Sequence, residues 1–257
     1  MISMFKNSAF LLTYFLLTSC GGNFSDEMKI TGKPEISKTD GARVNERSAD
    51  HKNSPYFKYP DFYNMKSTDH LTILPKFKTI QQSSEFSCGP AAALMVMDYF
   101  GKLGENNEQS LAQMRPKERP IKNIPEATNL ADMIKIFKTV GGFEMVTTYD
   151  YGFNTISEEN QVEMLEHFIK SGYAVLVLWN ASGPHWQVII GYDNMGTEKI
   201  ENDDVLIFAD SYDVNDHNQD GYTIYSAVRF VENWTIGRFG GPKPEDNEFQ
   251  FIAVRPE

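Results

Sequence analysis

Cysteine is scarce in this chain of 257 residues, with only Cys20 and Cys88 present. The sequence also lacks a basic cluster, an internal repeat and any long hydrophobic run after its N-terminus. Its formal charge is -11, and such an acidic chain is a poor candidate for binding nucleic acid or for electrostatic docking on anionic lipid. These absences give no support to a disulfide scaffold, a nucleic-acid-binding protein or a protein with several membrane spans.

The N-terminus is typical of an export signal. One charge, Lys6, precedes the apolar run Ala9–Leu17, which is too short for a membrane-spanning helix. The run ends in the letters LTSCG, which resemble the bacterial lipobox, in which the cysteine is lipidated and becomes the first residue after cleavage. We therefore expect residues 1–19 to be a lipoprotein signal peptide and Cys20 to be a lipid anchor. An ordinary signal peptide with an accidental cysteine is the less favoured interpretation.

The composition divides the rest of the chain into two parts. Residues 20–55 are polar, without sustained apolar periodicity, and are expected to form a flexible tether. Residues 56–257 regain aromatic and aliphatic residues and can form one substantial domain. By resemblance to bacterial lipoproteins, Gly21 in place of Asp behind the lipidated cysteine favours the outer membrane or the cell surface. The predicted location is the cell envelope, with the domain outside the cytoplasm.

Three helices are predicted from apolar spacing and end signals. The first begins at Cys88, with Pro90 in its first turn and Gly101 at its end. Residues 104–127 show no clear element. The second covers Leu130–Val140 with Thr128 as its N-cap and Gly141–Gly142 at its end, and the third follows a cap at Ser157 and closes at Gly172.

Beyond Gly172 the pattern changes to short runs rich in Val, Ile and aromatics, separated by Gly, Asn and Asp turns. The predicted strands are Ala174–Trp179, His185–Tyr192, Val205–Ala209, Tyr222–Tyr225 and Phe249–Val254. Helices that lead into an antiparallel sheet predict an α+β domain.

Cys88 is the candidate nucleophile. A thiol at a helix start has its thiolate favoured by the positive end of the helix dipole. Most free cysteines are inert packing residues. With Cys20 lipidated, however, Cys88 has no disulfide partner, and a solitary thiol in an exported protein is either buried or chemically required.

A cysteine nucleophile generally needs a histidine as its base, and His185 is the best placed. It opens an apolar strand, whereas the other histidines lie in the tether, in an undefined segment, in the middle of a helix and in an acidic loop: His51, His70, His167 and His217. Asp210 ends the next strand and is the candidate orienter of that base, with Asp193 as its nearest rival. A structural histidine and a turn-forming aspartate are the alternatives at these two positions.

These residues occur in papain-like order, and the chain resembles the bacteriocin-processing, double-glycine-type cysteine peptidases, peptidase family thirty-nine of the cysteine class. Gln82 stands six positions before the cysteine, where that family has a glutamine that helps to build the oxyanion hole. The resemblance implies a papain-like fold, with Cys88 as nucleophile, His185 as general base and acid, and Asp210 as orienter. Two departures are visible: there is no transporter span or nucleotide-binding motif, and Ser211 follows Asp210 where the family often has proline.

The chemistry expected is attack of the thiolate on a peptide carbonyl, formation of a thioester and hydrolysis, with no cofactor. Entry of an amine in place of water would make the same site an acyltransferase or transpeptidase. The partners expected are a peptide or protein substrate and the membrane, reached through the lipid. Two further alternatives stay open, namely a binding module that keeps the fold without turnover and, ranked last, a thiol redox protein.

An acidic loop near the C-terminal strands has some of the features of a calcium loop. Its oxygen-bearing residues precede Gly221 and comprise Asp213, Asn215, Asp216, Asn218 and Asp220. The loop lacks the bidentate Glu expected of a helix-loop-helix calcium site, so a solvated turn is favoured and no metal site is predicted.

Overall fold

The computed structural model describes residues 60–115, 127–151, 160–181, 183–197, 203–215, 219–235 and 249–257. The predicted signal peptide and the tether lie outside these residues. The helices are η2 (Phe62–Asn64), α2 (Cys88–Tyr99), α3 (Glu108–Gln113), α4 (Leu130–Val140), α5 (Thr148–Tyr151), α6 (Gln161–Lys170) and α7 (Ala227–Thr235). The strands are β1 (Leu71–Ile73), β2 (Phe143–Thr147), β3 (Ala174–Asn180), β4 (Pro184–Asp193), β5 (Val205–Ala209), β6 (Tyr222–Ser226) and β7 (Phe251–Pro256). None of the helices in these ranges is long and apolar enough to cross a membrane.

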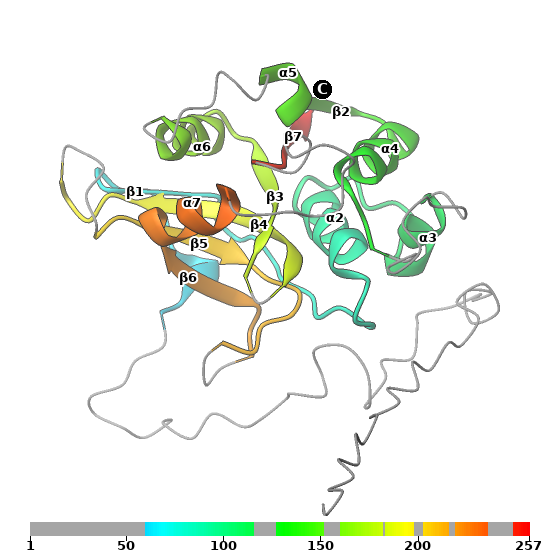
Figure 1. The fold of residues 1–257 in the computed structure, drawn as a ribbon, viewed down its shortest axis with the longest axis horizontal. Coiled ribbons are helices and arrows are strands. Elements are labelled where there is room, and N and C mark those ends of the chain that lie inside the picture. Colours follow the sequence, from blue (N-terminus) through cyan, green and yellow to red (C-terminus); the bar gives the residue numbers. More distant parts are fainter. Residues whose placement is uncertain are drawn as a thin grey trace, which may run out of the picture. The chain divides into compact units, whose positions relative to one another are not determined.

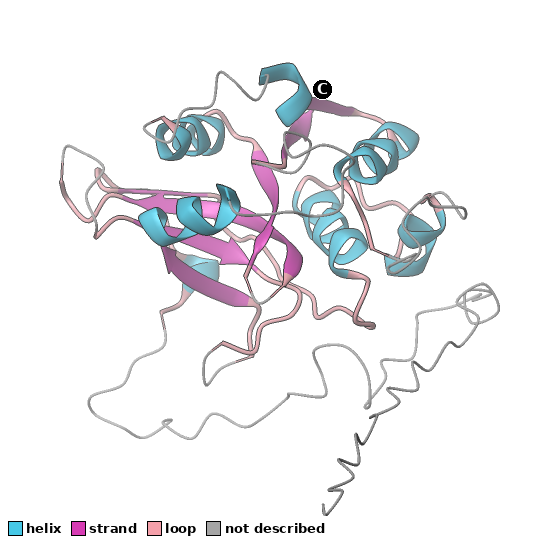
Figure 2. Cartoon of the chain, in the orientation of Figure 1, coloured by secondary structure: helices cyan, strands magenta, loops and turns pink. Residues whose placement is uncertain are grey.

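Among the described residues, seven strands form one antiparallel sheet with the order β2-β7-β3-β4-β5-β6, and β1 pairs with β4 (Figures 1 and 2). The register places His185 of β4 opposite Trp179 of β3. On the other side of β4, Val188 pairs with Ala209, so β5 ends beside the start of β4. The predicted α+β class with an antiparallel sheet is confirmed, and the topology brings the strand start at His185 next to the strand end at Asp210.

Helix α2 packs against β4, and it contacts α3 and α4, which Figure 1 shows grouped beside it. Its N-terminus approaches the segment before α4 closely: a Cβ added at Gly89 would lie 2.5 Å from Thr128 Cβ. Because only glycine leaves room for that approach, Gly89 allows the helix to start with its first residue against the sheet. This arrangement places Cys88 beside β4.

One expectation about the second helix, its N-cap, needs correction. Asn129, and not Thr128, is the N-cap of α4: its side chain accepts from Asp132 N–H at 2.8 Å, and Asp132 accepts from Asn129 N–H at 3.0 Å. Thr128 is drawn away by tertiary contacts, since its hydroxyl accepts from the Arg115 guanidinium at 3.2 Å and its carbonyl from Trp186 Nε1 at 2.7 Å. The C-terminal end at Gly141, which has φ of 77°, is as predicted.

Residues 104–127, in which the sequence showed no clear element, contain α3 in their first half. Helix α3 has its own capping box, in which Asn107 accepts from Ser110 N–H at 2.9 Å and Ser110 accepts from Asn107 N–H at 2.9 Å. The sequence prediction also omitted β1, β2, α5 and α7. The expected cap at Ser157 lies outside the described residues, and α6 begins at Gln161 and is followed by Gly172.

The core lies between the sheet and its helices. Helix α7 covers β3 and β6, where a cluster of buried aromatic rings fills the interface: Trp179, Phe208, Phe230 and Trp234. Burial of such large side chains contributes about 2–3 kcal/mol each to folding. The strands that carry the candidate site are thus supported by a rigid aromatic layer.

Candidate active site

Cys88 is the first residue of α2 and is buried, with about one-tenth of its surface exposed (9%). Its thiol lies beside the imidazole of His185 and the backbone N–H groups of Trp186 and Gly89, all of which act to lower its pKa. Donors around a sulfur atom stabilise the thiolate more than the thiol. The structure thus places the candidate nucleophile against the candidate base.

His185 and Asp210 form the second contact of the site. Nε2 of His185 lies 2.7 Å from Oδ1 of Asp210, whose carboxylate is almost fully buried. With Nε2 occupied by the carboxylate, Nδ1 is the ring nitrogen left to face the sulfur of Cys88. The rival Asp193 ends β4 eight residues away, where it accepts from the backbone N–H of Met195.

The three side chains shift one another's pKa values. Burial raises the pKa of Cys88, but the hydrogen bond and charge of His185 outweigh it, so the pKa of Cys88 is lowered. Burial lowers the pKa of His185, but the charge of Asp210 and its hydrogen bond raise the pKa to about 10. The pKa of Asp210 is also lowered, because His185 and two further donors outweigh its burial. At neutral pH these shifts favour a thiolate beside an imidazolium.

Gln187 extends this chain of contacts, and the sequence analysis did not identify it. Its Nε2 donates to Asp210 Oδ2 at 2.6 Å, and its Oε1 accepts from Trp179 Nε1 at 2.5 Å. Gln187 is fully buried and stands two residues after His185, so both side chains leave the same face of β4. A polar residue within the apolar run Trp186–Tyr192 was the signal in the sequence.

Gln82 is buried close to the end of β5 and is held at both ends of its amide. Its Oε1 accepts from the hydroxyl of Ser211 at 2.8 Å, and its Nε2 donates to the carbonyl of Ser84 at 2.7 Å. Its backbone N–H also donates to the carbonyl of Ser211 at 2.9 Å. A primary amide carries two N–H bonds, so one remains for another acceptor.

Glu108 fastens the loop between Gln82 and Cys88. This buried carboxylate accepts from the backbone N–H of Ser83 at 3.0 Å and from its hydroxyl at 2.9 Å. Burial raises the pKa of Glu108, against lowering contributions from Ser87, Ser83 and the charge of Arg115. Glu108 was not predicted as a site residue, because it lies in residues 104–127, where the sequence shows no clear element.

Tyr212 forms the rim of the site next to His185. Its ring stands edge-on to the imidazole with centroids 6.4 Å apart, and its hydroxyl donates to Glu85 at 3.0 Å. Its backbone N–H donates to Asp210 Oδ1 at 2.8 Å. Phe86 is exposed on the same loop as Glu85.

The remaining candidates lie elsewhere or outside the described residues. His167 is exposed on α6, His70 precedes β1, and His51 and His217 are not among the described residues. In the acidic loop, Asp213 is buried and accepts from Gly221 N–H at 3.0 Å, which gives it a structural partner, while residues 216–218 are not described. Within the described ranges, no group of three or more His, Cys, Asp or Glu side chains could hold a metal ion.

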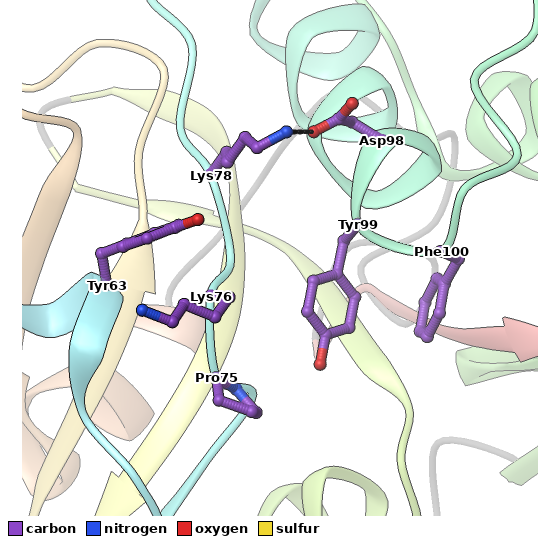
Figure 3. Close-up of a pocket in the computed structure, with 7 residues that line it drawn as sticks. All are labelled: Tyr63, Pro75, Lys76, Lys78, Asp98, Tyr99 and Phe100. Carbon is purple, nitrogen blue, oxygen red and sulfur yellow. Dashed lines mark hydrogen bonds and ion pairs between the residues drawn. The ribbon is translucent and has the colours of Figure 1, made fainter.

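A cavity of about 570 Å³ lies at the opposite end of α2 (Figure 3). Its lining residues are Tyr63, Pro75, Lys76, Lys78, Asp98, Tyr99 and Phe100. Nζ of Lys78 lies 3.3 Å from Oδ2 of Asp98. Lys76 lies over the ring of Tyr63, with its Nζ 4.5 Å from the ring centroid. Because α2 rises about 1.5 Å per residue, this end is roughly 15 Å from Cys88. The cavity is therefore separate from the candidate active site.

The chain was compared with protein-family models, with curated proteins and with solved structures. No curated protein matches it. The peptidase domain of Streptococcus ComA, described as a bi-functional ABC transporter involved in a quorum sensing pathway, is 16% identical with a TM-score of 0.39, over 70% of this chain and 99% of that one. A family model, described as Peptidase_C39 like family, matches residues 74–240, which include every residue of the candidate site and more than half of the chain. The family-model match shows that the chain belongs to the Peptidase_C39 like family, and its α+β domain with an antiparallel sheet has the papain-like fold of that family.

Proposed function

We propose that this protein is a cysteine peptidase that hydrolyses peptide bonds through Cys88, His185 and Asp210. The observation that supports it is a continuous series of contacts from the sulfur of Cys88 to the imidazole of His185 and on to the buried carboxylate of Asp210. In the second contact, Nε2 of His185 lies 2.7 Å from Oδ1 of Asp210. A histidine between a thiol at a helix start and a buried carboxylate is typical of a catalytic site, whereas a structural histidine requires only a hydrogen-bond partner. Membership of a peptidase family agrees with this role.

In the proposed reaction, the thiolate of Cys88 attacks the carbonyl carbon of a peptide bond, and the carbonyl oxygen takes the negative charge. The second N–H of Gln82 Nε2 and the backbone N–H of Cys88, which has no partner within the helix, would donate to that oxyanion. Collapse of the intermediate breaks the C–N bond as the imidazolium of His185 gives its proton to the leaving amine. His185 then takes a proton from water, and the resulting hydroxide attacks the thioester carbonyl; the C–S bond breaks, the carboxylic acid product leaves, and the thiolate of Cys88 is restored beside the imidazolium of His185.

The full chain carrying Cys20→Ser, in which Cys88 is the only thiol, tests this proposal by irreversible labelling with an epoxide cysteine-protease probe. Because the pKa of Cys88 is lowered, labelling should be rapid well below the ordinary thiol pKa of about 8.5. His185→Ala should move the rise of labelling to that ordinary pKa or above it, since burial is then opposed only by the backbone N–H groups of Trp186 and Gly89. Peptide cleavage also needs the imidazolium, so it should decline as the pH rises through the His185 pKa of about 10.

The matched control is His167→Ala, which removes an exposed imidazole on α6 and should leave labelling unchanged. Slow labelling that rises only near the pKa of an ordinary thiol, and that does not respond to His185→Ala, would contradict the proposed activity.

We also propose that Cys20 carries a lipid that anchors the domain to the cell envelope, outside the cytoplasm. The support is the lipobox-like sequence behind a short apolar run. Expressed in a bacterium, the full chain should partition into the detergent phase, and Cys20→Ser should move it almost entirely to the aqueous phase. Cys88 stays intact in that variant, so probe labelling should persist and serve as the folding control. If Cys20→Ser still partitions into the detergent phase as the parent does, the proposal that Cys20 carries a lipid anchor is wrong.

A further inference from the structure

We propose that Ser211 is a positioning residue that aims the amide of Gln82 at the oxyanion; this inference rests on the proposed peptidase function. Ser211 follows the candidate orienter Asp210 directly and stands where the resemblance to the family led us to expect proline. Proline has neither a hydroxyl nor a side-chain donor. The contact made by Ser211 is therefore a property of this chain.

Ser211 and Gln82 hold each other through two hydrogen bonds although they are 129 residues apart. The hydroxyl of Ser211 donates to Oε1 of Gln82 at 2.8 Å, and the backbone N–H of Gln82 donates to the carbonyl of Ser211 at 2.9 Å. Ser211 has no exposed surface and Gln82 has 1%. Water therefore cannot easily replace the serine hydroxyl as the partner of Oε1.

The polarity of this pair decides which end of the amide is available to the substrate. The carbonyl of Ser84 can only accept, so it selects Nε2 of Gln82, at 2.7 Å. The opposite end of the amide, Oε1, then needs a donor, and the hydroxyl of Ser211 supplies it. With both ends satisfied, the amide cannot turn over without losing two buried hydrogen bonds. The orientation of the Gln82 amide is therefore fixed, and its second Nε2–H bond stays directed toward the position of the oxyanion.

Asp210 and Ser211 are adjacent, so one dipeptide at the end of β5 supports two parts of the site. Asp210 binds the imidazole of His185, and Ser211 binds the amide of Gln82. Because the two side chains act on different groups, they can be separated by experiment. Substitution of Asp210 should change the reactivity of the Cys88 thiolate in every reaction. Substitution of Ser211 should change the rates only of reactions that pass through an oxyanion.

Two reagents make this separation without knowledge of the natural substrate. Iodoacetamide alkylates a thiolate at a saturated carbon and forms no oxyanion. p-Nitrophenyl acetate acylates the same thiolate through a tetrahedral oxyanion, and p-nitrophenolate is released as the leaving group. The ratio of acylation rate to alkylation rate at Cys88 therefore reports oxyanion stabilisation, and a merely structural change would alter both rates together.

In the full chain carrying Cys20→Ser, Ser211→Ala should slow acylation about 10-fold or more, below the roughly 10²- to 10³-fold cost of removing an oxyanion donor itself. Alkylation and its pH profile should stay within about 2-fold of the parent, because the Cys88–His185 contact is untouched. Ser211→Gly also removes the hydroxyl donor and keeps Cys88 as the only thiol, so it should show the same selective loss and provides a second test if the alanine variant folds poorly.

Gln82→Ala supplies the second arm of the test. If Ser211 acts through Gln82, adding Ser211→Ala to Gln82→Ala should slow acylation no further. The inference fails if Ser211→Ala leaves the rate ratio unchanged, lowers both rates equally, or adds to Gln82→Ala. Failure of the proposed peptidase itself looks different, since the parent chain would then react with both reagents no faster than an ordinary thiol.

Discussion

Replacement of Asp210 by asparagine should slow acylation of Cys88 by roughly 10²- to 10⁴-fold at neutral pH, the range associated with a disabled orienter of a catalytic histidine. Loss of the carboxylate charge removes the main contribution that raises the pKa of His185 to about 10. The imidazole then becomes neutral, and the pKa of Cys88 rises because the positive charge of His185 no longer opposes the effect of burial. The measurement is the pH dependence of alkylation and acylation, and both should shift toward an ordinary thiol.

The hydrogen-bond chain behind Asp210 explains why even an isosteric amide should fail. The indole of Trp179 can only donate, which fixes Oε1 of Gln187 toward it and Nε2 of Gln187 toward Asp210 Oδ2. The other oxygen, Oδ1, already accepts from His185 and from the backbone N–H of Tyr212. Both oxygens of residue 210 must therefore accept, and an amide would place its NH₂ group against another donor in either orientation.

The same reasoning provides a compensating variant. In the double variant Asp210→Asn with Gln187→Glu, the new carboxylate can accept from both Trp179 and the amide of residue 210, and one negative charge returns near His185. Acylation should recover at least about 10-fold relative to Asp210→Asn alone. Gln187→Glu alone should slow the reaction, because it sets two carboxylates against each other. If Gln187→Glu lowers the rate in both backgrounds, the proposed polarity of the chain is wrong.

The elements predicted well are those whose signals are local and long. Helix α2, helix α4 and strands β3 to β5 have continuous apolar patterns with glycine or polar residues at their ends, so their bounds could be placed within a few residues. Of the strands missed, β1 has only three residues and pairs with β4, and β2 has five residues and pairs with β7 at the end of the chain. Helix α3 was missed because its six residues carry too few apolar positions to show a period.

The choice between Thr128 and Asn129 shows where sequence reasoning ends. Both residue types are good N-caps, and their local preferences differ little. The difference comes from Arg115 and Trp186, which bind Thr128 from elsewhere in the chain. Such long-range competition leaves no local pattern.

The candidate site divides in the same way. Cys88, His185 and Asp210 could be nominated because each stands at the end of a recognisable element and each has a chemically distinctive side chain. Their supporting partners could not be nominated in the same manner, since Ser211 meets Gln82 only in the folded chain. Gln187 is marked only weakly in the sequence, as a lone polar residue within an apolar strand, and its role depends on the indole of Trp179, which donates to it from the neighbouring strand.

Replacement of Cys88 by alanine should have the largest effect of all, because it removes the nucleophile and every later step depends on the thioester. Cleavage of a complex peptide mixture, followed by mass spectrometry of new N-termini, should fall to the uncatalysed background, roughly a 10⁶-fold loss by analogy with other nucleophile deletions. Cys88→Ser is the matched control for packing. It is nearly isosteric, yet a serine hydroxyl is not ionised at neutral pH as the Cys88 thiol is, so it should be almost as inactive.

The alternatives predict different results for these two variants. A binding module that keeps the fold without turnover would show no new N-termini from the parent chain, and both variants would bind peptides as the parent does. An acyltransferase would lose activity with Cys88→Ala, but the parent would attach an added amine to the acyl fragment instead of releasing a free carboxylate. Thermal unfolding should change little in Cys88→Ser, because α2 is held by Gly89 against Thr128 and by its packing on β4. A folded Cys88→Ser protein that still cleaves peptides at the parent rate would show that the thiol is not the nucleophile, and the chemistry would then have to be sought away from the start of α2.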